Sequence, residues 1–172
     1  MGLREVKAEL ENLDKKQLIK LVGELYKKYP SVKQHLDFYA DPKEEELLKT
    51  YKQNIYKNFY PERGFGLNLK EAKKYITQFK KLEVSTFYLA DLMLYYVECG
   101  VQFTNDFGDI DENFYISMEK MYYQTLELMN KSGLLDHFQP RAEQVVTDTK
   151  GMGWGFHDGL CDSYYTFYSD HN

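Results

Sequence analysis

The strongest constraint on the fold comes from residues 85–104. A helix formed by these residues carries apolar side chains on nearly every side. Nine members of this set are Phe87, Leu89, Leu92, Met93, Leu94, Tyr95, Tyr96, Val97 and Val101. A helix that is apolar all round is normally the buried centre of a globular fold. Asp91 and Glu98 interrupt the segment, which is therefore no membrane span. We expect a central helix from a cap at Ser85 to about Thr104.

The rest of the chain repeats apolar residues at helical spacing, and no segment alternates as a strand does. Helix starts are predicted at the caps Asp14, Asn68 and Asp111, and Gly133 is a predicted helix end. The sequence therefore predicts an all-α, single-domain multi-helix bundle of about eight helices in antiparallel pairs. A short α-solenoid of stacked helix pairs is the alternative. Residues 1–172 are taken as one helical domain, with 1–40 the most separable segment.

Charge is divided unevenly along the chain, whose formal net charge is −5. Residues 1–81 hold 18 Lys+Arg against 12 Asp+Glu, whereas residues 82–172 hold 4 against 15. Such asymmetry favours a protein partner or self-association through opposite charges. The overall acidity disfavours nucleic acid as a general partner. We also expect no membrane segment and a cytoplasmic location, with Cys99 and Cys161 reduced.

Residues 49–81 are strongly basic, with nine Lys+Arg and two acidic residues among interleaved aromatics. One interpretation is two amphipathic helices with lysine-coated outer faces and aromatic inner faces. The other is contact with a polyanion. Arg63 lies in a glycine-containing loop before a helix start, so Arg63, Lys73 and Lys74 are candidate ligands for a phosphate or carboxylate.

A glycine-rich stretch, "GMGWGFHDGL" at residues 151–160, contains the only tryptophan. Its context predicts a turn between two helices, because a dinucleotide-binding motif needs a preceding strand. On that interpretation Trp154 anchors the turn by burying its ring, and Asp158 complements the start of the next helix. On the alternative interpretation Trp154, His157 and Asp158 line a small-molecule or catalytic pocket.

Two further groups of polar residues are weak candidates for metal sites. The acidic run at 104–113 lacks the spacing of a calcium loop and is predicted to be a turn with a helix cap. His157 and Cys161 are four residues apart, but the chain shows no paired spacing among its other histidines. We therefore expect no metal and no other cofactor.

Several blocks of the sequence resemble a known family. These are "LADLMLYYVECGVQFTNDFGDID", "RGFGLNLKEAKKYITQFKKL", "GWGFHD" and the leading "LxxLDKKQLIKLV" pattern. Together they are similar to small bacterial helical proteins catalogued as a domain of unknown function. The resemblance spans nearly the whole chain and implies a stand-alone helical protein, but it assigns no catalytic residue.

The function that the sequence favours is a helical interaction or adaptor module with a basic N-terminal half and an acidic C-terminal half. The alternative is a small-molecule-binding protein or enzyme whose pocket lies near the glycine-rich turn. The sequence shows no arrangement of a nucleophile and a base, so it favours a binding protein over an enzyme.

Overall fold

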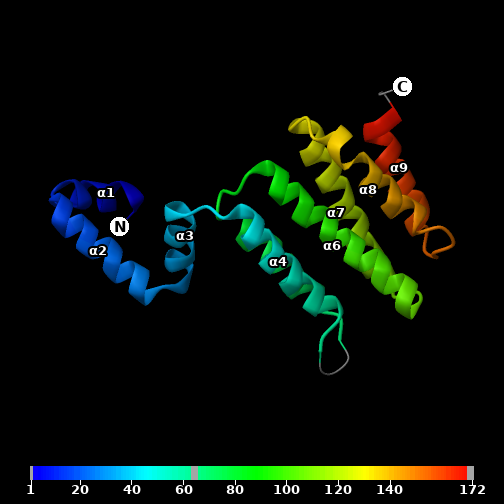
Figure 1. Ribbon diagram of the computed structural model, residues 1–172, viewed down its shortest axis with the longest axis horizontal. Coiled ribbons are helices and arrows are strands. Elements are labelled where there is room, and N and C mark those ends of the chain that lie inside the picture. The colour runs from blue at the N-terminus through cyan, green and yellow to red at the C-terminus, as the bar shows by residue number, and fades with distance from the viewer. Residues whose placement is uncertain (1, 63–65, 170–172) are drawn as a thin grey trace. The chain divides into compact units, whose positions relative to one another are not determined.

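The computed structural model describes residues 2–62 and 66–169, and these residues form nine helices and no strand (Figure 1). The all-α prediction is confirmed, with 79% of the described residues helical and one helix more than the expected eight. The helices are α1 Leu3–Glu11, α2 Lys15–Lys28, α3 Pro30–Ala40, α4 Glu44–Phe59, α5 Leu69–Lys80, α6 Thr86–Phe107, α7 Glu112–Lys131, α8 Leu135–Thr147 and α9 Phe156–Tyr168.

Local capping signals account for most helix starts. The side chains of Asp14, Asn68 and Asp111 each accept a hydrogen bond from the backbone N–H three residues later, at 2.9, 3.1 and 2.9 Å. These bonds satisfy N–H groups that a helix start leaves free. Ser85 stands at the predicted position but makes no side-chain cap bond. Its N–H instead donates to Glu44 Oε1, 2.5 Å away, which ties the start of α6 to the start of α4.

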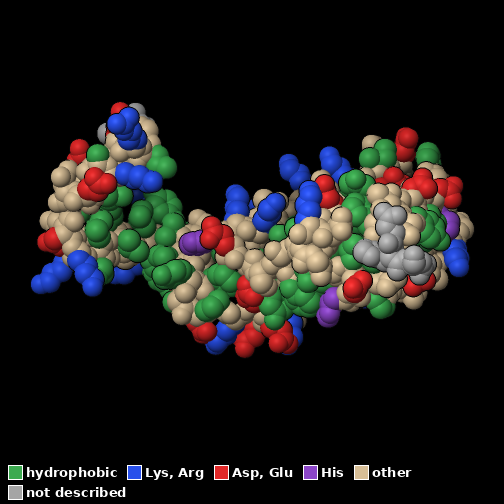
Figure 2. Space-filling view, turned by 90° about the horizontal axis from the view of Figure 1, so that it is seen from above, with side chains coloured by type: hydrophobic (Ala, Val, Ile, Leu, Met, Phe, Trp, Pro, Cys, Tyr) green, Lys and Arg blue, Asp and Glu red, His purple; other side chains and the backbone are tan. Residues whose placement is uncertain are grey.

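The chain divides into two compact units, residues 1–43 and residues 44–172. In the first unit α2 packs on α3, and Tyr26 and Lys33 both donate to the Asp37 carboxylate. None of the side chains of α1, α2 and α3 is buried. Figure 2 shows hydrophobic side chains gathered on the visible face of this unit.

The second unit is built around α6, as the sequence predicts. Helix α6 packs against α4, α5, α7 and α8. Its buried residues are Leu89, Ala90, Leu92, Leu94, Tyr96, Val97, Cys99, Gly100, Val101 and Thr104. Burying aromatic and aliphatic side chains on both sides of one helix is the main source of stability in such a core.

The order of the six helices in this unit is simple. Among the described residues, every extensive contact joins a helix to the next helix in the chain or to the one after it. Neighbours in sequence run antiparallel, so alternate helices run parallel. Thus Lys52 and Phe59 of α4 meet Asp91 and Tyr96 of α6 in the same order.

Candidate functional site

The glycine-rich turn between α8 and α9 leaves its tryptophan in solvent. Trp154 is 61% exposed, so the prediction that its ring is buried is wrong. The turn is held from within instead. The Gly153 N–H donates to Asp109 Oδ1 at 3.3 Å, and the buried ring of Phe156 packs on Tyr115 with centroids 4.6 Å apart. Trp154 also has a left-handed backbone, with φ 61°, which few residues other than glycine adopt.

His157 is fixed by a chain of hydrogen bonds within the turn. The Thr149 hydroxyl has one proton, which it donates to the Val146 carbonyl at 2.8 Å. The same hydroxyl lies 3.0 Å from His157 Nδ1, within hydrogen-bond distance. His157 Nε2 lies 3.5 Å from the Cys161 sulfur. Both ring nitrogens are engaged inside the protein, which accounts for the histidine structurally.

The predicted site residues of the basic segment 49–81 do not gather around this turn. Asp158 lies in the first turn of α9, as predicted. Lys74 pairs with Glu71 at 3.0 Å, and burial together with nearby Lys120 lowers the pKa of Lys73. Arg63 lies outside the described residues. Because α5 and α9 share no extensive contact in the described part of the chain, the two predicted sets do not form one site.

A pocket that sequence reasoning missed lies on the opposite side of α6 from α5 and α7. Helices α4 and α8 both pack on α6, yet among described residues they share no extensive contact with each other. The space between them is a pocket of about 310 Å³. Its lining is Tyr56, Tyr60, Tyr95, Glu98, Cys99, Val101, Gln102, Arg141, Gln144, Val145 and Asp148.

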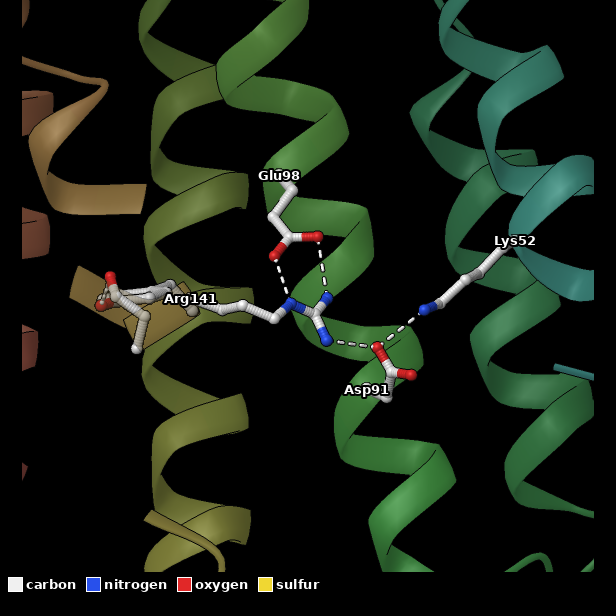
Figure 3. A network of polar contacts seen from close by, with 6 residues as sticks. Lys52, Asp91, Glu98 and Arg141 are labelled. Atoms are coloured by element: carbon white, nitrogen blue, oxygen red, sulfur yellow. Dashed lines mark hydrogen bonds and ion pairs between the residues drawn. The ribbon is translucent and has the colours of Figure 1, made fainter. Parts of the chain in front are cut away.

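A network of ion pairs joins the three helices at one end of the pocket (Figure 3). Arg141 of α8 binds Glu98 of α6 through two parallel bonds, Nε to Oε1 and Nη2 to Oε2, both 2.8 Å long. Its remaining Nη1 donates to Asp91 Oδ1 at 2.6 Å. Lys52 of α4 donates to the same oxygen at 2.8 Å. Two cations and two carboxylates therefore balance, and they hold α4 and α8 at a fixed spacing across α6.

At the opposite, open end of the pocket the polar side chains are neutral donors. Tyr60 donates its hydroxyl to Asp106 Oδ2 at 2.6 Å, and Gln102 donates to the other oxygen at 2.8 Å. Burial and the adjacent Asp106 carboxylate raise the pKa of Tyr60 above its ordinary range. Burial likewise raises the pKa of Tyr95. Both phenols therefore remain protonated at neutral pH.

The reactive side chains of the lining are protonated or already paired. Burial raises the pKa of the Cys99 thiol to about 12, so the thiolate that a nucleophilic cysteine needs is scarce at neutral pH. Glu98, the carboxylate on the pocket floor, has both oxygens occupied by Arg141. Across residues 2–62 and 66–169, no three His, Cys, Asp or Glu side chains are grouped so that they could hold a metal ion.

One signal in the sequence pointed to this pocket. Asp91 and Glu98 interrupt an otherwise apolar helix and are seven residues apart, which places both on one face. In the sequence alone these two charges indicate only that the helix is no membrane span. Charged residues on the most buried helix need partners, and the available partners were Lys52 and Arg141 on other helices.

The fold and the pocket define a small all-α protein with an aromatic, preformed cavity between three helices. The chain belongs to the family of unknown function DUF6155, whose model matches residues 1–164. This confirms the resemblance found in the sequence. No curated protein and no solved structure matches the chain. In the described part of the protein, no helix has the length and apolar character needed to cross a bilayer.

Proposed function

We propose that the chain is a ligand-binding protein and not an enzyme, and that the pocket between α4, α6 and α8 is its binding site. The observation that carries the proposal is the preformed space of about 310 Å³ lined by three tyrosines. Its volume lies at the lower end of the ~300–1,000 Å³ range of small-molecule sites. Pockets of that kind combine apolar walls with a few fixed polar groups, here Glu98, Gln102 and Arg141.

The ion pairs around the pocket support this assignment because they hold the site open without a ligand. A pocket that keeps its shape when empty avoids the ordering cost that binding otherwise carries. The ligand would be small, since the walls belong to only three helices. The free thiols of Cys99 and Cys161 support a reducing compartment, and the family resemblance supports a bacterial cell, so we place the protein in the bacterial cytoplasm.

A pair of matched variants tests the binding site. Gln102 is an exposed residue at the pocket, and Gln102→Trp should fill its mouth without disturbing the core. Gln53→Trp places the same bulk on an exposed position of α4 outside the lining. Ligand-detected NMR with a set of small organic fragments should find binders that Gln102→Trp loses and Gln53→Trp keeps. Binding that survives in Gln102→Trp, or a complete absence of binders, would overturn the proposal.

A second candidate function, self-association, rests on residues 1–43. Several apolar side chains of this unit are exposed, namely Leu3, Val6, Ile19, Val22, Leu25 and Tyr29. Helix α2 surrounds its apolar stripe with five lysines and a single glutamate. Residues 82–172 carry 15 acidic residues against 4 basic ones, so a second copy of the chain offers a surface of complementary charge.

Light scattering on the full chain tests this association. We expect a dimer at low salt and a smaller mean mass as salt is added, because salt screens exposed charges. Replacing Lys27 and Lys28 by glutamate should weaken the dimer, whereas replacing Lys80 and Lys81 should not. A monomer at every salt and protein concentration would exclude self-association.

A further inference from the structure

The charges that face the pocket are not balanced, and this imbalance bears on the ligand. The inference rests on the binding site proposed above. Arg141 has its Nε and Nη2 on Glu98 and its Nη1 on Asp91, so its charge is already neutralised. An incoming anion would find no free cation among the described residues of the lining. It would also face the carboxylate of Asp148, which no cation balances in the described part of the chain.

Two carboxylates at the pocket are paired only with neutral donors. Asp148 Oδ1 accepts from the Gln144 amide at 2.6 Å. Asp106 accepts from the Tyr60 hydroxyl and from the Gln102 amide, both of which line the pocket. Neither aspartate belongs to any ion pair recorded between described residues. The open end of the pocket therefore carries uncompensated negative charge.

The aromatic rings add a second attraction for cations. Tyr56 and Tyr60 stack with their centroids 4.7 Å apart, and Tyr56 is 47% exposed. Tyr95 already holds a cation, because Lys52 Nζ lies 5.2 Å from the centroid of its ring. The face of an aromatic ring is electrostatically negative and binds alkylated ammonium groups well when they are removed from water.

Bare metal ions do not fit this combination. Hard cations bind best where several carboxylates converge, and the described residues bring no three His, Cys, Asp or Glu side chains together for a metal ion. An ammonium ion that carries methyl or alkyl groups uses both features, since its apolar surface contacts the rings and its charge faces the carboxylates. We propose that the ligand of the pocket is a small organic cation, an alkylated or quaternary ammonium compound.

Comparing choline with its neutral carbon analogue 3,3-dimethylbutan-1-ol tests the charge requirement directly, because the two molecules have nearly the same shape. Isothermal calorimetry and NMR titration of the full chain should show at least a tenfold preference for choline. Adding salt should weaken choline binding and leave the alcohol unaffected. Tetramethylammonium serves as a second cationic probe, and a peptide bearing trimethyllysine tests whether a protein side chain supplies the cation. Tighter binding of the free ion or of the peptide identifies the source, and both results support the inference.

Substitutions at the pocket provide the controls. Tyr95→Leu and Asp148→Asn should each weaken choline binding by about fivefold or more, whereas Asp162→Asn, the same change on an exposed part of α9, should not. If choline and the alcohol bind equally well and Gln102→Trp loses both, the proposal of a cationic ligand is overturned. The proposed binding site then still stands. The same holds if only neutral or anionic fragments bind there. If no compound of any charge binds, both proposals fail.

Discussion

Arg141→Met is the substitution that best tests how the three pocket helices are held together. Methionine keeps much of the apolar stem of the arginine but removes all three bonds to Glu98 and Asp91. Lys52 then remains the cation paired with Asp91, and Glu98 loses the ion pair that it forms with Arg141. We expect the substitution to lower the free energy of unfolding and to loosen α8 from α6.

The magnitude follows from how deeply the groups are buried. The side chains of Arg141, Glu98 and Asp91 are 36%, 30% and 13% exposed. Exposed ion pairs contribute ~0.2–1 kcal/mol, whereas breaking a buried pair costs ~3–5 kcal/mol. A half-buried bidentate pair with a third bond belongs between these values, so the expected loss is about 2 kcal/mol. For a chain of this length that corresponds to a fall of about 4–8 °C in the melting temperature.

Urea denaturation followed by far-UV circular dichroism measures the effect. Lys49→Met is the matched control, because Lys49 and Glu45 form an ion pair on α4 in which both side chains are about two-thirds exposed. Its unfolding midpoint should equal that of the wild type. In a double-mutant cycle, Glu98→Gln should cost much less in the Arg141→Met background than alone. If Arg141→Met behaves like Lys49→Met, the network does not stabilise the pocket and the reasoning fails.

Three further predictions concern the core, the turn and the phenols. Gly100→Ala should destabilise the protein by about 1–2 kcal/mol, because the new methyl group meets Met118. Gly23→Ala has open space around it and should stabilise α2 by about 0.5–1 kcal/mol. The urea midpoints of the two variants should therefore shift in opposite directions. Trp154→Gly should unfold at the same temperature as the wild type or at a higher one, because glycine relieves the left-handed backbone and little buried surface is lost. Trp154→Val should unfold at a lower temperature. The reverse order would contradict the idea that the positive φ of residue 154 strains the turn. Burial raises the pKa of Tyr96 from 10.0 to about 12, so its contribution to stability is complete below pH 10 and is lost as the pH rises toward 12. Tyrosinate absorbance and circular dichroism should therefore change together in that interval, and tyrosine ionisation completed near pH 10 in a folded protein would exclude the effect.

The features that could be predicted from the sequence are those that short-range interactions determine, namely helix starts and the buried central helix. The caps at Asp14, Asn68 and Asp111 lie three residues from the N–H groups that they bind, so their patterns are visible in the chain. The central helix was equally predictable, because its composition requires burial on every side. Trp154 was misjudged since a large ring is usually buried, whereas here the short turn points it outward and Phe156 fills the core instead.

The pocket could not be predicted in the same way, because its parts are distant in sequence. Lys52 and Asp91 are 39 residues apart, and Asp91 and Arg141 are 50 apart. Their meeting depends on α4 and α8 packing on the same side of α6. Helical periodicity gives the inward face of each helix but not the choice of neighbour, so it leaves this arrangement undetermined.

The helix order of residues 44–172 also determines how this unit opens. Since extensive contacts reach no further than the next helix but one, no contact of that kind joins α4 or α5 to α8 or α9 in the described residues. The unit behaves as a short linear array whose two ends can loosen independently, as repeat proteins do. Amide hydrogen exchange should accordingly be slowest in α6 and become faster toward α4 and α9. Because the pocket spans α4, α6 and α8, a bound ligand would connect helices on either side of the array's centre and slow exchange in both.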